Sequence, residues 1–251
     1  MSLILRTEGL SRSWGAFKAN SDISLTFAAG ARHALIGPNG AGKTTFINLL
    51  TGSLAPTSGR VFFGDEDITT LSQHQRVKRG ITRTFQINTL FPGLTVLQSV
   101  LLAICERRGL QSNWYQTVAQ RSDEIDEAMA LLASLKLTPE ADRETRNLPY
   151  GKQRLVEIAL ALATKPRVLL LDEPAAGMND AETEELRDDI RRIRASGVTV
   201  FLVEHDMGLV FRFAERITVL VGGKVLTEGT PAEIAADARV KEVYLGEAEH
   251  E

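Results

Sequence analysis

A glycine-rich segment, residues 37–45, has the sequence GPNGAGKTT. It fits the pattern G-x-x-x-x-G-K-S/T, in which glycines let successive backbone N–H groups face phosphate oxygens. The lysine of the pattern adds positive charge near the β and γ phosphates, and the hydroxyl after it can bind magnesium. We predict that this loop binds the triphosphate of ATP together with Mg²⁺. Lys43 is also a candidate catalytic residue and Thr44 a candidate metal ligand. The predicted nucleotide contacts are Gly37, Pro38, Asn39, Gly40, Ala41, Gly42, Lys43, Thr44 and Thr45.

Two adjacent carboxylates, Asp172 and Glu173, follow a continuous apolar run at residues 168–171. Open α/β sheets bind their ligands at the carboxyl ends of strands, so a nucleotide site would use carboxylates at this position. We expect Asp172 to hold Mg²⁺, directly or through water. We expect Glu173 to orient or deprotonate the water that attacks the γ-phosphate. A lone Asp-Glu pair would more often be two exposed carboxylates, and the phosphate loop in the same chain favours the catalytic role.

The residues around these groups predict the elements that hold them. Residues 31–36 and 45–50 are typical of a strand and a helix on the two sides of the loop, the context that such a loop requires. The apolar runs at residues 168–171 and 198–203 predict buried parallel strands, with a charged helix over residues 181–194 between them. The sequence therefore predicts an α/β fold with a P-loop NTPase core.

Further elements are predicted around this core. Residues 3–27 alternate apolar and polar stretches, broken by glycines and by a turn at residues 20–22, which predicts an antiparallel β layer. Between residues 95 and 163, apolar residues recur with helical spacing, which predicts an inserted helical subdomain. Residues 217–226 predict a hairpin, and residues 230–233 have the composition of a capping box that begins a helix.

We expect a single domain over residues 1–251, built from three parts. Residues 1–85 and 164–236 would form the nucleotide-binding core with its β layer, and residues 86–163 the helical subdomain. Residues 237–251 would form a small, polar C-terminal tail. Residues 107–121 mix charges, a glycine and two aromatics without clear periodicity, so the sequence leaves their conformation open.

Composition narrows the class of protein. The chain has a formal net charge of −3 and 43% hydrophobic residues, as in an ordinary soluble domain without the basic surface of a nucleic-acid binder. Its one cysteine, Cys105, cannot form an internal disulfide, and no leader-like segment opens the chain. The apolar runs are far shorter than the roughly 20 residues of a membrane-spanning helix. We expect a cytosolic protein that acts at a membrane only through partners.

With its motifs taken in order, the chain resembles the nucleotide-binding subunit of ATP-binding cassette (ABC) transporters over nearly its whole length. The resemblance implies that Gln86, in the run TFQ, reaches Mg²⁺ and the attacking water from a loop that faces the membrane subunit. It implies that His205 contacts the γ-phosphate and acts in catalysis. It also implies that Trp14 stacks on adenine, a role for which Phe17 competes. A lone histidine or glutamine would more often be structural or simply solvated, and the order and spacing of the motifs favour these roles.

The run LPYGKQR at residues 148–154 aligns with the family signature segment, which closes over the ATP of the opposite protomer. Where the family usually has a serine and two glycines, this chain has Pro149, Tyr150 and Gly151. Pro149 lacks both a hydroxyl and a backbone N–H, while Gly151 remains for close approach to the ATP of the partner subunit. Asn179 stands where the loop after Glu173 commonly has aspartate. Because both changes lie on surfaces that serve the other subunit, we expect this chain to pair with a different ATPase.

Several segments, such as DEPAAGMN and VEHDM, resemble motifs of the branched-chain or hydrophobic amino-acid uptake subgroup. Urea and short-chain amide importers share many of these motifs. The resemblance implies a bacterial importer with two multispanning permease subunits, a second ATPase and an extracytoplasmic solute-binding protein. The chain would then lie on the cytoplasmic face of the inner membrane as a peripheral subunit. An exporter ATPase, for example for lipopolysaccharide, is the nearest alternative, and the transported solute stays open. A nucleic-acid ABC ATPase or a P-loop kinase explains fewer of these motifs.

Overall fold

The structure is a computed structural model that describes residues 3–84, 91, 93–110, 121–195 and 197–247. A mostly parallel sheet forms its centre. Its strand order is β11-β10-β4-β9-β8-β7, and all neighbours are parallel except β10 and β11, which pair as an antiparallel hairpin. The strands are β4 (Arg32–Ile36), β7 (Ile81–Arg83), β8 (Val168–Asp172), β9 (Thr199–Val203), β10 (Arg216–Val221) and β11 (Lys224–Gly229).

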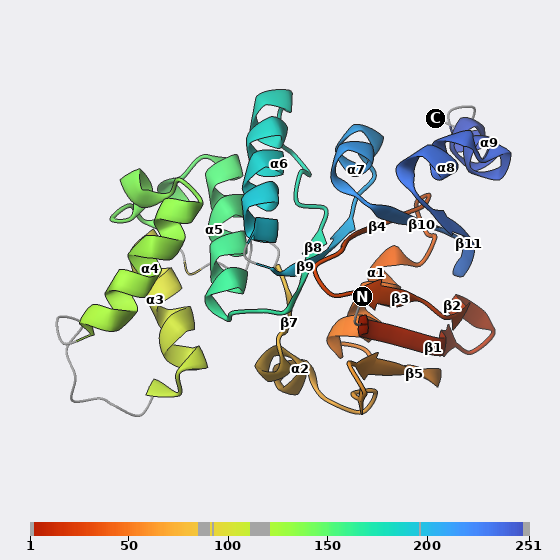
Figure 1. Cartoon of the computed structure of the whole chain (residues 1–251), viewed down its shortest axis with the longest axis horizontal. Coiled ribbons are helices and arrows are strands. Elements are labelled where there is room, and N and C mark those ends of the chain that lie inside the picture. The colour runs from red at the N-terminus through yellow and green to blue at the C-terminus, as the bar shows by residue number, and fades with distance from the viewer. Residues whose placement is uncertain (1–2, 85–90, 92, 111–120, 196, 248–251) are drawn as a thin grey trace.

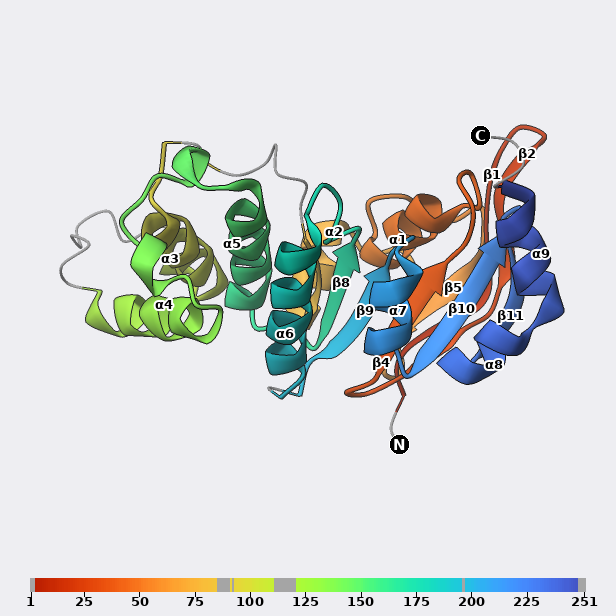
Figure 2. The same cartoon turned by 90° about the horizontal axis from the view of Figure 1, so that it is seen from above.

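A second, antiparallel sheet contains the N-terminal strands in the order β2-β1-β5-β6, with β3 also paired to β1. This sheet is the predicted antiparallel β layer, and Figure 2 shows it at one end of the molecule, opposite α3 and α4. Its strands are β1 (Leu3–Trp14), β2 (Phe17–Ile23), β3 (Thr26–Ala28), β5 (Ser58–Phe63) and β6 (Glu66–Asp67).

The central strands β4, β8 and β9 are buried on both faces, which explains why they are largely apolar. Leu35, Leu170 and Phe201 point into a core shared with the antiparallel sheet and the helix after the phosphate loop. Their neighbours Ala34 and Leu169 point into the core on the opposite face, which is covered by helices. This alternation along each strand fixes which side chains can reach the carboxyl edge of the sheet.

Helices α3, α4 and α5 lie together at the other end of the molecule (Figure 1). Their buried residues belong to the same core as one face of the parallel sheet. The predicted α/β fold with an inserted helical subdomain is therefore confirmed. The residue boundaries given above for the core, the helical subdomain and the tail stay predictions. The helices are α1 (Lys43–Thr51), α2 (Gln73–Arg79), α3 (Val96–Arg107), α4 (Ser122–Ser134), α5 (Tyr150–Ala163), α6 (Asp180–Ala195), α7 (Met207–Phe213), α8 (Pro231–Ala236) and α9 (Ala238–Glu247).

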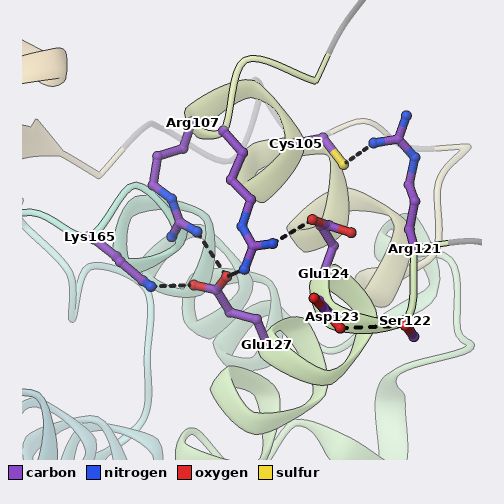
Figure 3. A network of polar contacts seen from close by, with 9 residues as sticks. Cys105, Arg107, Arg121, Ser122, Asp123, Glu124, Glu127 and Lys165 are labelled. Carbon is purple, nitrogen blue, oxygen red and sulfur yellow. Dashed lines mark hydrogen bonds and ion pairs between the residues drawn. The ribbon is translucent and has the colours of Figure 1, made fainter. Parts of the chain in front are cut away.

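An ion-pair network joins α3 and α4 to the segment that follows α5 (Figure 3). The carboxylate of Glu127 on α4 accepts hydrogen bonds from Arg107 at 2.8 Å and Arg108 at 2.6 Å, and lies 2.9 Å from the ammonium of Lys165. Arg108 also donates to Glu124 at 2.5 Å. Hydrogen bonds lower the pKa of Glu127 to about 2, and the bond from Arg107 has the largest effect. Because Lys165 follows α5, the network connects the α3–α4 pair to the segment that leads into β8.

Two details differ from the sequence predictions. The turn predicted at residues 20–22 is wrong, because these residues belong to β2. There the Ser21 N–H donates to Gly223 at 2.8 Å, and Asp22 has a positive φ of 55°, so turn-forming side chains sit in an irregular strand. The tail, predicted to be small and polar, forms the helix α9 over residues 238–247 and buries the apolar side chain of Val240. Of the segment 107–121, residues 111–120 lie outside the described part of the chain.

Candidate functional site

The predicted phosphate loop connects β4 to α1, as the sequence indicates. Two of its glycines have backbone conformations and surroundings that exclude other residues. Gly42 has φ 96°, and a Cβ there would lie 2.3 Å from the carbonyl oxygen of Ala19. A Cβ on Gly37 would lie 2.1 Å from the carbonyl oxygen of Leu220. The loop therefore packs directly against the backbones of β2 and β10, and only glycine fits at these two contacts.

Lys43, the first residue of α1, is buried within the loop. Its ammonium donates to the carbonyl oxygens of Gly37 at 2.5 Å and Pro38 at 3.0 Å, so the positive charge lies across the loop. Thr44 is exposed in the first turn of α1, and Thr45 is half-buried beside it. The helix N-terminus, the lysine and the exposed hydroxyl together have the donors that bind phosphate groups and a magnesium ion.

The other predicted groups lie at the ends of β9, the strand next to β4, and of β8, the strand beyond β9. Val203 at the end of β9 pairs with Leu35 of β4 on one side and with Asp172 of β8 on the other. Since the strands are parallel, the phosphate loop, His205 and the Asp172–Glu173 pair all follow carboxyl ends at the same edge of the sheet. The structure thus brings these three predicted elements together.

Asp172 has a partner that the sequence did not indicate. Its carboxylate forms an ion pair with the guanidinium of Arg83, the last residue of β7, the strand paired with β8. The same guanidinium donates to the side-chain oxygen of Asn48 on α1 at 2.7 Å. Arg83 therefore connects the expected metal ligand to the helix of the phosphate loop.

Glu173 and His205 face each other at the edge of the sheet. Nδ1 of His205 lies 3.9 Å from Oε1 of Glu173, and their side chains are 64% and 47% exposed. Glu173 has a φ of 46°, the left-handed region that a residue with a side chain seldom adopts. Both groups are open to a ligand at this edge, and Glu173 is held in a strained backbone conformation.

The two aromatic candidates for adenine stacking lie side by side on the β1–β2 hairpin. Trp14 and Phe17 are a cross-strand pair with ring centroids 6.5 Å apart and planes 22° apart, and both rings are exposed. The guanidinium of Arg12 lies 4.8 Å from the Trp14 ring centroid. The hairpin is tied to the phosphate loop because the side-chain amide of Asn20 donates to Gly42 at 3.2 Å. The arrangement keeps both rings as candidates.

The signature-like segment begins α5 and lies apart from the chain's own phosphate loop. Pro149 occupies the N-cap position without a capping side chain, and the Tyr150 ring packs close to Gly177. Gly151 is buried against α6, where an added Cβ would lie 2.9 Å from the Glu182 carboxylate. Asn179 and Glu182 exchange hydrogen bonds of 3.0 and 3.1 Å, so Asn179 caps the start of α6.

The donors for a metal ion are few but suitable. In the described part of the chain, no group of three or more His, Cys, Asp or Glu side chains could hold a metal ion. Mg²⁺ usually binds one or two protein ligands together with substrate phosphates, so the exposed Thr44 hydroxyl and the Asp172 carboxylate fit such a site. Gln86, the third predicted ligand, lies outside the described residues.

Two residues near the site were missed by the sequence reasoning. Arg83 precedes the TFQ run directly, and Glu204 is an acidic residue placed between an apolar strand and His205. A charged residue at the end of a buried strand was the available signal for both. Their partners could not be read from the sequence, because the contacts depend on which strands are neighbours.

The fold and the site define an ATP-binding cassette ATPase. The chain belongs to the ABC transporter family, whose model matches residues 20–176. A second model, described as branched-chain amino acid ATP-binding cassette transporter, matches residues 224–250. Among residues 3–84, 91, 93–110, 121–195 and 197–247, no helix is long and apolar enough to cross a membrane.

Individual proteins similar to this chain are also ATP-binding subunits of transporters. The chain is 40% identical to the high-affinity branched-chain amino acid transport ATP-binding protein BraF of Pseudomonas aeruginosa, over 98% of each chain. It is 39% identical to LivG of Escherichia coli, a protein of the same description, again over 98% of each. The crystal structure of the ADP conformation of MJ1267, an ATP-binding cassette of an ABC transporter, matches with a TM-score of 0.87 and 32% identity. That match covers 98% of this chain and 100% of the other.

Proposed function

We propose that this chain is the ATP-hydrolysing subunit of a bacterial importer for branched-chain or other amino acids. Membership of the ABC family supports a transporter ATPase. The match of residues 224–250 to the branched-chain model and the likeness to BraF and LivG support the solute class. ATP binding and hydrolysis by this chain would switch the membrane subunits between their outward-facing and inward-facing conformations.

The observation that best supports ATP hydrolysis as the activity is the strand register. It places the phosphate loop, the Asp172–Glu173 pair and His205 at one edge of the sheet. Lys43 and the N–H groups of the loop would bind the β and γ phosphates, and Thr44 with Asp172 would hold Mg²⁺. When bound, Mg²⁺ would neutralise developing charge on the phosphate oxygens. Glu173 would orient or deprotonate the attacking water, and His205 would contact the γ-phosphate. We also keep Gln86 as a proposed ligand of the metal and of that water.

The general-base role is tested by Glu173→Gln in the assembled transporter. We expect ATP binding to remain and hydrolysis to fall about 10²- to 10⁴-fold, the usual contribution of a positioned acid or base. Glu8→Gln is a control, because Glu8 is an exposed carboxylate on β1, away from the site. Turnover of Glu173→Gln at the wild-type rate would show that the general-base assignment is wrong.

The membrane partners would dock in a groove between α2, α3 and α5. It has a volume of about 610 Å³, and its wall includes the exposed apolar side chains of Phe91 and Leu102. Exposed apolar groups gathered in a groove mark protein interaction sites. We propose that a helical segment of each multispanning permease subunit occupies this groove, which would hold the chain peripherally on the cytoplasmic face of the inner membrane.

Leu102→Glu tests this docking surface. A buried carboxylate without a partner is costly, so the variant should lose the permease subunits on co-purification while nucleotide binding stays normal. Leu3→Glu is the matched control, since Leu3 is equally exposed on β1 and away from the groove. Co-purification of Leu102→Glu at the wild-type level would exclude the groove as the docking site.

A second ATPase would complete the nucleotide site. The altered signature at Pro149 favours a heterodimer, in which the partner's signature covers the ATP bound here and this chain's signature covers the ATP of the partner. The full importer would also need an extracytoplasmic solute-binding protein. A stable ATP-dependent homodimer of the purified chain with full activity would contradict the heterodimer.

The solute is tested by reconstituting the complete transporter with its binding protein in vesicles. ATP-dependent uptake of leucine, isoleucine or valine, absent with Lys43→Ala, is the expected result. Uptake of urea or short-chain amides instead would assign the chain to the alternative importer class. ATP-dependent movement in the opposite direction would favour an exporter.

A further inference from the structure

Glu204 is a buried carboxylate at the carboxyl edge of the sheet. It follows β9, whose residues are all buried, and is itself only 1% exposed. A carboxylate is costly to bury unless its oxygens accept hydrogen bonds. Its place between β4 and β8 puts it among the three motifs of the site.

Backbone N–H groups from two different loops satisfy this carboxylate. Oε1 accepts from the N–H of Ala175 at 2.9 Å, and Oε2 accepts from the N–H of His205 at 3.1 Å. Burial raises the pKa of Glu204 above its ordinary value, and the hydrogen bonds from Ala175 and His205 offset only part of this rise. Hydrogen bonds to an ionised acceptor are about twice as strong as neutral ones, so the carboxylate is a firm anchor for both loops.

One of these loops begins at Glu173. The N–H of Glu173 donates to Val203 at 2.8 Å, and two residues later the Ala175 N–H donates to Glu204. The left-handed backbone of Glu173, with φ 46°, lies between these two anchors. A non-glycine residue keeps such a conformation only where its surroundings fix it. Val203, the last residue of β9, and Glu204, which follows it directly, are those surroundings.

The other loop joins β9 to α7 and contains His205, which follows Glu204 directly. Its N–H is held by Glu204, and its ring nitrogen Nδ1 lies 3.9 Å from both the Glu204 and the Glu173 carboxylates. One buried side chain thus fixes the backbone on both sides of the Glu173–His205 contact.

We propose that Glu204 is a positioning residue that holds Glu173 and His205 in a single arrangement for ATP hydrolysis. This inference rests on the catalytic roles proposed for those two residues. Glu204 is too buried to touch the nucleotide, and it acts through the backbone N–H groups of Ala175 and His205.

Glu204→Gln tests the inference in the assembled transporter. The side chain keeps its shape, but one oxygen becomes an NH₂ group that faces an N–H donor instead of accepting from it. We expect kcat to fall at least about tenfold, since small displacements of reacting groups have effects of this size or larger. The KM for ATP and the affinity for ADP should change less than about twofold, because the phosphate loop keeps its own contacts. An unchanged kcat, or a rise of KM in place of the fall in kcat, would overturn the proposal.

Asp189→Asn separates positioning from general stabilisation. Asp189 is another buried carboxylate, paired with Arg192 on α6 at 2.5 Å. We expect it to lower the melting temperature with kcat unchanged. If Asp189→Asn lowers kcat as much as Glu204→Gln at an equal loss of stability, Glu204 has no special role. If Glu204→Gln does not fold, Glu204→Asp serves instead. Its shorter side chain cannot span both donors, and a wild-type kcat would overturn the proposal equally.

The double variant distinguishes this inference from the proposed function. If Glu204 acts through Glu173, adding Glu204→Gln to Glu173→Gln should lower the residual rate by a smaller factor than Glu204→Gln lowers the wild-type rate. A full multiplicative loss would show that Glu204 acts independently and would overturn the inference. If Glu173→Gln alone keeps the wild-type rate, the proposed catalytic role fails. If only Glu204→Gln keeps it, the inference fails and the role stands.

Discussion

The carboxylate of Asp172 forms an ion pair with the guanidinium of Arg83 across the β7–β8 pair. Both side chains are largely buried, and Arg83 also donates to Asn48 on the helix of the phosphate loop. The carboxylate expected to serve Mg²⁺ therefore has a positively charged partner from the neighbouring strand. A metal ion at Asp172 must share this carboxylate with Arg83 or displace it.

Removal of the charge at Arg83 should tighten metal binding. Arg83→Gln keeps a polar side chain but removes a cation close to the metal site. Two unit charges about 4 Å apart repel by about 1 kcal/mol even in water, which corresponds to about a fivefold change in affinity. We expect the affinity for Mn²⁺ in the presence of ADP, measured by electron paramagnetic resonance, to rise at least about fivefold. ADP binding without metal should stay unchanged.

Arg83→Lys is the matched control for this measurement, because it retains the positive charge. It should bind Mn²⁺ about as the wild type does, although a lysine cannot reach Asp172 and Asn48 together in the same geometry. If Arg83→Gln binds Mn²⁺ more weakly than the wild type, the guanidinium orients the carboxylate for the metal and does not compete with it.

Lys43→Ala should abolish productive ATP binding. The variant loses the positive charge at the loop and also the two hydrogen bonds from the ammonium to Gly37 and Pro38. We expect nucleotide affinity, measured by titration calorimetry, to fall at least about a hundredfold, the effect of about 2.7 kcal/mol. Lys224→Ala, at an exposed lysine on β11, should bind like the wild type. Retained affinity in Lys43→Ala would remove the lysine from the binding site.

The local parts of the site were predictable because they are contiguous in sequence. The loop at Gly37–Thr45 shows its strand, turn and helix within about twenty residues, and the apolar run before Asp172 identifies a buried strand directly. The turn at residues 20–22 was wrong for the converse reason. Asn20 and Ser21 have turn-forming side chains, but their hydrogen bonds go to Gly42 and Gly223, which are distant in sequence.

The partners of Arg83 and Glu204 were beyond prediction for a related reason. The first depends on β7 lying beside β8, and the second on β9 lying between β4 and β8. Strand order is a property of the whole chain, and no local pattern contains it. The charged residue at the strand end could be seen in the sequence, whereas the group that it contacts could not.

The Glu127 network should stabilise the protein in a pH-dependent way. The pKa of Glu127 is lowered from 4.5 to about 2, first by the hydrogen bond from Arg107. A lowered pKa means that the carboxylate stabilises the fold fully above about pH 4.5 and loses this effect as the pH falls toward about 2. Glu127→Gln should therefore cost about 1–2 kcal/mol at pH 7, after allowance for solvent screening.

Denaturant unfolding of both proteins between pH 7 and pH 3 checks this prediction. The difference between wild type and Glu127→Gln should be constant near neutrality and shrink below about pH 4.5. Glu144→Gln is the control, since Glu144 pairs with Arg146 on the surface and should contribute about 0–1 kcal/mol. A difference that grows in acid would contradict the lowered pKa.

Pro149→Ser should improve the signature segment in two separable ways. Pro149 has φ −55° and ψ 153° at the N-cap of α5, a conformation in which serine can accept from the N–H groups of the first turn. The new cap should stabilise the chain by about 1 kcal/mol, which corresponds to about 2–4 °C in a domain of this size. Pro149→Ala has no capping oxygen, so it should lack this gain.

The functional effect of Pro149→Ser should appear at the site of the partner ATPase. In a transporter whose own site is disabled by Glu173→Gln, the remaining hydrolysis would occur at the site that this chain's signature covers. Serine restores a hydroxyl and an N–H there, so Pro149→Ser should hydrolyse ATP faster than Pro149→Ala, which restores the N–H alone. Equal rates would show that the hydroxyl does not reach the nucleotide. If neither variant exceeds the wild type, the altered signature does not weaken the partner's site, and the argument for a heterodimer from Pro149 fails.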